Sequence, residues 1–105
     1  MQVIFDKLAE NMQLIYRKAI DADNTLNALQ KDGKGKFSNI FNSNEGFRVS
    51  SKRFMPYVEE LSNDIAELSQ KDDATIQAAL PSVVQKLELL MKTLNQFQQS
   101  LRTKA

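Results

Sequence analysis

The stretch that decides the fold is LPSVVQKLELLMKTLNQFQQSL, residues 80–101. Its apolar residues recur in alternating steps of three and four without a break. They fall at Leu80, Val83, Leu87, Leu90, Leu94, Phe97 and Leu101. A spacing that averages 3.5 residues places them on one narrow face of an α-helix, as in a helix that packs lengthwise in a bundle. The stretch therefore predicts a long helix with one face in the core.

The same alternation occurs twice more upstream of this stretch. In residues 3–30 it runs through Phe5, Leu8, Met12, Ile15, Ala19, Ala22, Leu26 and Leu29. A shorter version follows at Phe54, Val58, Leu61, Ile65 and Leu68. Three stripes of this kind predict an all-α fold, an antiparallel three-helix bundle. A chain of 105 residues suits one domain, so we expect residues 1–105 to form a single bundle.

Glycine and proline set the boundaries of the first two helices. Gly33 and Gly35 have poor helix propensity, so the first helix should end at about Lys31. Pro56 has no amide hydrogen and is tolerated only in the first turn of a helix. We therefore expect the second helix to begin near Phe54.

The start and the continuity of the third helix depend on two features. Asp72 and Asp73 precede the apolar pattern and suit an N-cap. Pro81 leaves two alternatives open: a short helix over 73–79 that stops before a new one, or one helix that kinks at the proline. The kinked helix is the alternative that we favour.

The first connection, about residues 31–50, is rich in Gly, Ser and Asn and contains an apolar group. Phe37, Ile40 and Phe41 would share one side of a single helical turn, which predicts an additional short helix near residues 36–42. Phe47 follows after a polar break. We expect these rings to close one end of the core, because exposed phenylalanines would lower solubility.

Composition removes most catalytic and metal-binding chemistry. The chain has no cysteine and no histidine, the side chains that most often serve as nucleophile, general base or metal ligand. The sequence therefore predicts no enzyme activity, no cofactor and no metal. Apolar runs are short and the N-terminus lacks the pattern of a signal peptide, which favours a cytoplasmic protein with no membrane contact.

Charge is distributed unevenly although the formal net charge is only +1. Residues 31–53 contain six basic and two acidic residues, whereas residues 59–73 contain six acidic residues and one basic residue. We expect the basic segment to be a partner-binding site for an acidic peptide, or for phosphates with bases stacked on the rings. Its candidate residues are Lys34, Lys36, Phe37, Phe41, Phe47, Arg48 and Arg53. The alternative is a solvated loop whose aromatic rings face inward.

The acidic run leaves a similar choice open. It is either a docking site for a basic partner or a solvated helix face whose charges are matched by Lys86 and Lys92 on the neighbouring helix. Glu59 and Glu60 point away from each other on a helix, so they do not form a catalytic carboxylate pair.

The region from Phe37 to Leu68 carries a resemblance to a known family. Its matching residues are Phe37, Ile40, Phe41, Arg53, Phe54, Tyr57, Glu60, Leu61, Ile65 and Leu68. The chain resembles the N-terminal half of the bacterial primosomal replication protein PriC family, also called primosomal replication protein N double-prime. Members share a long amphipathic helix, a phenylalanine-rich loop and a helix that opens with a basic residue. They are longer, with an Arg-rich C-terminal half that this chain does not contain.

The resemblance implies a non-enzymatic accessory of DNA replication restart. It would act through protein contacts with the replicative helicase or with single-stranded DNA-binding protein. Single-stranded DNA itself is a weak partner for this chain alone, because a net charge of +1 supplies little counterion release. The alternative from the residues is a small cytoplasmic helical adaptor or export chaperone that binds a partner helix.

Overall fold

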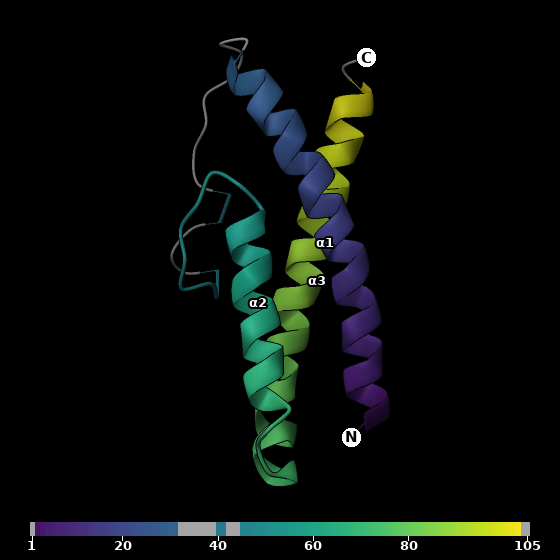
Figure 1. Cartoon of the computed structure of the whole chain (residues 1–105), viewed down its shortest axis with the longest axis vertical. Helices are drawn as coiled ribbons and strands as arrows, with labels where there is room; N and C mark the ends of the chain where they lie inside the picture. Colours follow the sequence, from purple (N-terminus) through teal and green to yellow (C-terminus); the bar gives the residue numbers. More distant parts are fainter. Residues whose placement is uncertain (1, 32–39, 42–44, 104–105) are drawn as a thin grey trace.

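Three α-helices pack against one another in the computed structural model, which describes residues 2–31, 40–41 and 45–103 (Figure 1). They are α1 (Gln2–Lys31), α2 (Met55–Leu68) and α3 (Asp73–Thr103). The molecule is elongated, with principal extents of 49 × 25 × 18 Å. The prediction of an all-helical chain with three main helices is confirmed.

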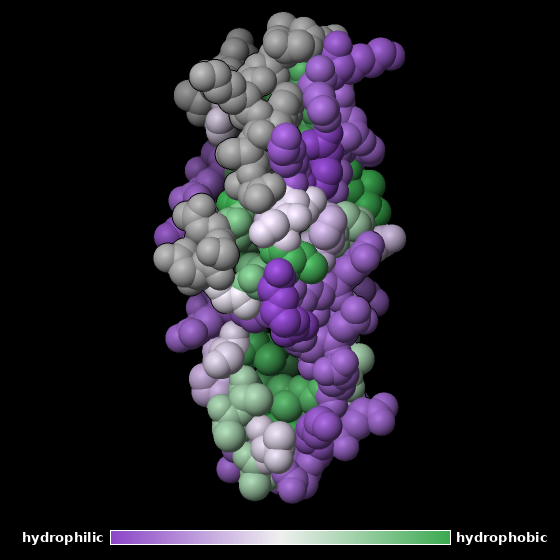
Figure 2. All heavy atoms as spheres, turned by 90° about the vertical axis from the view of Figure 1, so that its left-hand side faces the viewer, coloured by the Kyte–Doolittle hydropathy of each residue, from purple (hydrophilic) through white to green (hydrophobic). Residues whose placement is uncertain are grey.

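Each of the three helices packs against the other two. In Figure 1, α1 and α2 lie on either side of α3 in the lower part of the molecule, and α1 slants across α3 towards the top. The N-terminus and the α2–α3 connection lie at the lower end, and the ends of α1 and α3 lie at the upper end. On the side that carries α2, Figure 2 shows hydrophobic atoms between hydrophilic ones in the lower half.

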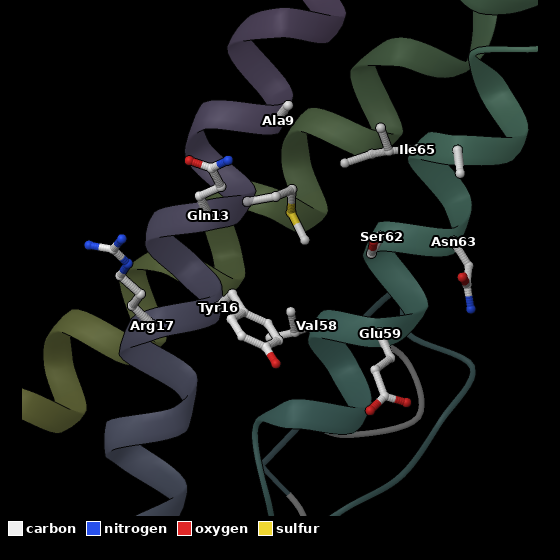
Figure 3. Close-up of a pocket in the computed structure, with 11 residues that line it drawn as sticks. Ala9, Gln13, Tyr16, Arg17, Val58, Glu59, Ser62, Asn63 and Ile65 are labelled. Atoms are coloured by element: carbon white, nitrogen blue, oxygen red, sulfur yellow. The ribbon is translucent and has the colours of Figure 1, made fainter.

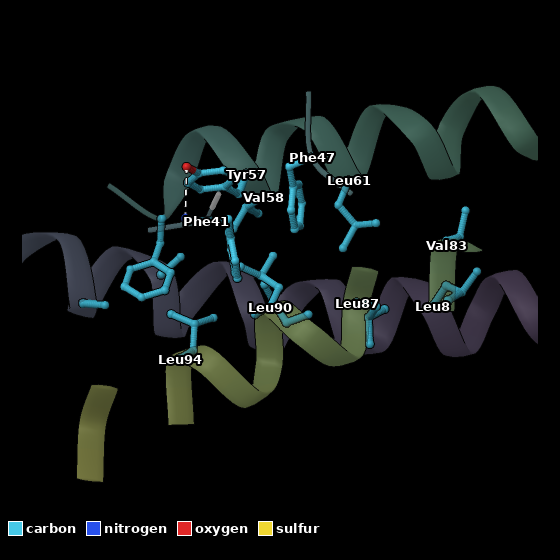
Figure 4. Close-up of a cluster of buried hydrophobic side chains, with 14 of the residues drawn as sticks. Leu8, Phe41, Phe47, Tyr57, Val58, Leu61, Val83, Leu87, Leu90 and Leu94 are labelled. Atoms are coloured by element: carbon cyan, nitrogen blue, oxygen red, sulfur yellow. Dashed lines mark hydrogen bonds between the residues drawn. The ribbon is translucent and has the colours of Figure 1, made fainter. Parts of the chain in front are cut away.

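The core is formed mainly by residues of the apolar stripes that the spacing predicts, and Tyr57 and Ile76 join it from outside those stripes (Figure 4). Its buried members on the helices are Leu8, Ile15, Ala19 and Ala22 from α1, Tyr57, Val58, Leu61 and Leu68 from α2, and Ile76, Val83, Leu87, Leu90 and Leu94 from α3. Phe41, Phe47 and Phe54 complete the buried cluster. They belong to the segment before α2, of which the structure describes residues 40–41 and 45–54. Burial of these side chains away from water is the main stabilising contribution to the fold.

The start of α2 is stabilised by a carboxylate from another helix. Asp23 of α1 accepts hydrogen bonds from the amides of Phe54 at 2.7 Å and Met55 at 3.0 Å. Pro56 lies in the first turn, as predicted, where its missing amide hydrogen costs nothing. The first amides of a helix have no partner within the helix, so Asp23 supplies the N-cap that the residues before α2 do not.

The third helix is continuous. Asp72 accepts a hydrogen bond from the amide of Thr75 at 2.8 Å, as expected for an N-cap. Hydrogen bonds from the Thr75 side chain and from this amide lower the pKa of Asp72. Pro81 lies inside α3, so the alternative of a helix that stops at 79 and restarts is wrong. Core packing on both sides of the proline, through Ile76 and Val83, holds the two segments in one helix.

The predicted short helix near residues 36–42 falls mainly outside the residues that the structure describes. Its two described residues, Ile40 and Phe41, form a bend. Within residues 2–31, 40–41 and 45–103, no helix combines the length and the apolar character that crossing a bilayer requires.

Candidate functional site

The seven residues predicted as a partner site do not form one exposed patch in the part of the chain that the structure describes. Lys34, Lys36 and Phe37 lie outside the described residues. Phe41 and Phe47 are buried, with exposed fractions of 3% and 4%. Their rings belong to the core, so the expectation that bases or a peptide stack on them is wrong. The alternative, in which the aromatic rings face inward, holds for Phe41 and Phe47.

Phe41, Phe47 and Tyr57 form a compact aromatic cluster (Figure 4). The Phe41 and Phe47 rings stack with centroids 4.9 Å apart, and Tyr57 meets both edge-on at 4.9 and 5.1 Å. Gly46 directs the chain into this cluster with a φ of 103°, a conformation that other residues rarely adopt. The cluster joins the segment before α2 to the bundle.

The hydroxyl of Tyr57 holds that segment by three hydrogen bonds. It accepts from the amides of Ser51 at 2.8 Å and Phe41 at 3.4 Å, and it donates to the carbonyl of Ser51 at 3.0 Å. A phenolic hydroxyl has one donor and two acceptor positions, so these contacts use all of its capacity. Tyr57 is fully buried and therefore has a structural role.

Glu60 is a second buried anchor for the same segment. One carboxylate oxygen accepts the amides of Arg48 at 2.8 Å and Val49 at 2.9 Å, and the other accepts Lys86 Nζ at 2.7 Å. Burial raises the pKa of Glu60, but the hydrogen bonds from Lys86 and the two amides outweigh it, so the pKa is lowered overall. The carboxylate is thus held in its charged form.

Lys86 and Arg48 extend this anchor into a charged network. Lys86 Nζ also contacts Asp64 at 2.7 Å and lies 4.8 Å from the centre of the Phe47 ring. Arg48, whose side chain is 70% exposed, donates to Asp64 at 2.7 Å. Lys86 thus pairs with Glu60 and Asp64 of the acidic run, as the second interpretation expected, but Glu60 is buried and is not part of a solvated face.

Arg53 is held at a different helix. Its guanidinium donates to Asn27 Oδ1 at 2.8 Å, to the carbonyl of Lys52 at 3.1 Å and to Gln30. Asn27 and Gln30 belong to α1, whereas Arg48 bonds to Asp64 of α2. The two arginines of the predicted site thus have different structural partners, and each has hydrogen bonds within the chain.

A surface feature outside the predicted site is an open groove between α1 and α2, with a volume of about 750 Å³ (Figure 3). Its inner part is apolar: Val58 is buried, and Met12 and Ile65 are half-buried. Tyr16 is 51% exposed, and Figure 3 shows its ring beside Val58 in the space between the two helices. An apolar interior that remains open to solvent is a feature of surfaces that bind partners.

The outer parts of the groove combine small and charged residues. Ala9 lies on the α1 wall, and Ser62 and Ala66 lie on the α2 wall; all three are exposed. Arg17 and Glu59 occupy opposite sides, one on each helix (Figure 3). Among the residues that the structure describes, neither has an ion-pair partner. The groove thus has a basic edge and an acidic edge.

One pattern in the sequence does mark the groove. Tyr16 and Ile20 follow Met12 of the core stripe in steps of four, so an apolar row extends along α1 away from that stripe. Tyr16 and Ile20 are both exposed, the latter by 37%. Because the core stripe alone explains why α1 is a helix, this row is the local signal for an uncovered face.

Every buried side-chain nitrogen or oxygen among the described residues has a hydrogen-bond partner. The same residues include no group of three or more His, Cys, Asp or Glu side chains placed to hold a metal ion. Comparison of the chain with protein-family models, with curated proteins and with solved structures gives no match.

Proposed function

We propose that this chain is a non-enzymatic interaction module that binds a protein partner through the groove between α1 and α2. The observation that carries the proposal is the apolar interior of the groove, open to solvent beside the half-exposed ring of Tyr16. The proposal takes the three helices as an antiparallel bundle, which the course of the chain in Figure 1 supports. It assigns the chain no reaction and no cofactor.

The contrast between the groove and the segment before α2 supports this choice of surface. Phe41 and Phe47 of that segment are buried, and Glu60 of α2, which binds the segment's amides, is buried too; all three are engaged in contacts within the chain. Groups that are already satisfied gain little from a partner, because a new contact must replace an existing one. Apolar side chains in the groove still contact water, and covering them supplies a driving force for association.

We further propose that the partner belongs to DNA replication restart and that the chain is a PriC-like accessory in the cytoplasm. The order of elements supports this: a long amphipathic helix, a segment with buried phenylalanines, and a helix preceded by Arg53 and carrying Tyr57 and Glu60. The replicative helicase and single-stranded DNA-binding protein are then the partners. Direct binding of single-stranded DNA is the weaker proposal, since Arg48 and Arg53 already have partners within the chain.

A second candidate is a small cytoplasmic helical adaptor or export chaperone. It is favoured by the groove itself, because a groove bounded by two helices can hold a third helix from a client protein. The two candidates differ in the identity of the partner and agree on the surface that binds it.

Capture of purified partners by variants of the chain tests this proposal. Ala66→Arg places a long charged side chain in the groove, and Ala78→Arg makes the same change at an exposed position of α3 outside it. Neither should alter helicity or melting, because both sites are exposed and Arg is a good helix former. We expect wild type and Ala78→Arg to capture replicative helicase or single-stranded DNA-binding protein, and Ala66→Arg to lose it. Failure of wild type to capture either protein would refute the replication-restart role. Equal capture by both variants would refute the groove as the binding surface.

A further inference from the structure

We infer that the groove between α1 and α2 binds one amphipathic α-helix of another protein, with an acidic flank facing Arg17 and a basic flank facing Glu59. The inference rests on the proposed role of the groove as a binding surface and adds the chemistry of what it binds. A bound helix would lie lengthwise between α1 and α2, in the position that a fourth helix has in a four-helix bundle.

The walls of the groove favour a helix over an extended peptide. Both walls are the middle parts of regular α-helices, residues 9–17 of α1 and 58–66 of α2, whose backbone groups are bonded within each helix. An extended peptide needs backbone donors and acceptors from its binding site, as at the edge of a sheet, and these walls do not provide them. A helix brings its own backbone hydrogen bonds and needs only a surface for its side chains.

The dimensions and the chemistry of the groove also match a helix. Each wall extends over eight residue steps, which is about 12 Å at 1.5 Å per residue. That length accommodates apolar side chains at positions i, i+3 or i+4, and i+7, which cover about 11 Å of a partner helix. Met12, Val58 and Ile65 give this seam an apolar base. The short side chains of Ala9, Ser62 and Ala66 leave space for its backbone to approach.

The charges at the two edges define what flanks the apolar seam. Arg17 and Glu59 are exposed on opposite sides of the groove, and neither is in an ion pair among the residues that the structure describes. Opposite charges on the two flanks of a bound helix would pair with both edges at once. A helix with the same charge on both flanks meets repulsion at one edge in either orientation.

A second copy of this chain and an arbitrary apolar peptide are the competing occupants. Sedimentation of the chain alone tests whether a second copy is the occupant. A monomer is expected, and a wild-type dimer that becomes monomeric in Ala66→Arg would show that the groove is an interface between copies and would overturn the inference.

Fluorescence anisotropy with designed peptides tests the charge order, which is the predicted pairing of an acidic flank with Arg17 and a basic flank with Glu59. The probes are three labelled helices of about 18 residues, long enough to be helical in isolation, each with one leucine seam. The mixed peptide has one acidic and one basic flank, the second peptide has two acidic flanks, and the third has two basic flanks. Wild type should bind the mixed peptide about two- to fivefold more tightly than either of the others, the range of exposed ion pairs. Arg17→Glu should shift the preference to the peptide with two basic flanks, and Glu59→Lys to the peptide with two acidic flanks.

Matched control variants separate the effect of the chain's net charge from the effect of where the changed charge lies. Lys7→Glu and Glu10→Lys make the same charge changes on α1 outside the groove and should leave the order of affinities as in wild type. Ala66→Arg should weaken binding of every peptide by at least about tenfold. Equal binding of the three peptides to wild type, or a preference that follows net charge in the controls too, would overturn the charge order. Loss of peptide binding while a protein partner is still captured through the groove would refute this inference and leave the proposed function standing.

Discussion

Tyr57 and Tyr16, the two tyrosines of the chain, lie in regions that use their side chains differently. Tyr57 is fully buried, meets two phenylalanine rings and has three hydrogen bonds to the segment before α2. Tyr16 is 51% exposed beside the groove between α1 and α2. The same residue type thus stabilises the fold at one site and remains available to a partner at the other. The two tyrosines thus differ in how many contacts they make within the chain, and this difference is the basis for proposing a binding role only for the groove.

The largest effect should come from truncating the buried tyrosine. Tyr57→Ala should lower the free energy of unfolding by about 4 kcal/mol, because it removes a buried ring and leaves the Ser51 amide without its partner. Tyr16→Ala should change it by less than about 1 kcal/mol. Urea unfolding of both variants measures the difference. Similar losses for the two would remove the distinction between the regions.

Glu59 and Glu60, adjacent on α2, should differ in the same way in their contribution to stability. Glu60→Gln should cost about 2 kcal/mol, because Lys86 loses a charged partner and the amides of Arg48 and Val49 lose a carboxylate acceptor. Glu59→Gln should be within about 0.5 kcal/mol of wild type in stability, since Glu59 is exposed. Unfolding in urea is the measurement, and a neutral Glu60→Gln would show that the network does not hold the segment.

A smaller effect should follow from the cap that α1 supplies to α2. Asp23→Ala should lower stability by about 1 kcal/mol, because it removes the acceptor for the Phe54 and Met55 amides. Asp21→Ala, two residues away and exposed, is the matched control. Thermal unfolding followed by circular dichroism compares them. Equal melting temperatures for the two variants would contradict the cap across helices.

Acid titration gives the most gradual effect. Burial raises the pKa values of Glu60 and Asp64. The hydrogen bonds from Lys86, together with those from the Val49 and Arg48 amides to Glu60 and from the Arg48 side chain to Asp64, outweigh burial and lower both pKa values below the ordinary 4.5 and 3.8. Between the folded and the unfolded pKa values, the unfolded chain binds more protons than the folded chain. Both carboxylates therefore stabilise the fold at pH values above their ordinary pKa values. Stability is lost as pH falls through the folded pKa values.

Urea midpoints measured from about pH 6 to about pH 3 test that sign. Wild type should lose stability as the pH falls, and the Glu60→Gln, Asp64→Asn double variant should show a shallower slope. The Glu59→Gln, Glu67→Gln control removes two acidic residues from the same helix and should keep the wild-type slope. A double variant as steep as wild type would mean that other carboxylates set the acid response.

The helices could be predicted because their signals are local. Alternating steps of three and four marked all three helices, and Pro56 and Asp72 marked two of their starts. Spacing alone could not decide between a broken and a continuous α3 at Pro81, because packing on both sides of the proline determines that outcome.

The candidate site was harder to predict because its contacts join distant residues. Asp23 caps a helix that begins more than thirty residues later, and Lys86 pairs with Glu60 from another helix. Phe41 and Phe47 lie within a basic segment that predicted a docking surface, whereas in the structure both rings face inward. The row of Met12, Tyr16 and Ile20 was visible in the sequence, but only the position of α2 makes Met12 and Tyr16 part of one wall of a groove.

The most direct test of the central claim is a map of amide chemical shifts of the chain as the mixed-charge peptide is added. We predict that the largest changes fall on residues 9–17 of α1 and 58–66 of α2, with Tyr16 and Ala66 among them, and that the amides of Arg48 and Arg53 change little. Saturable changes centred on residues 45–53, with the groove unaffected, would contradict the account and return the binding site to the segment before α2.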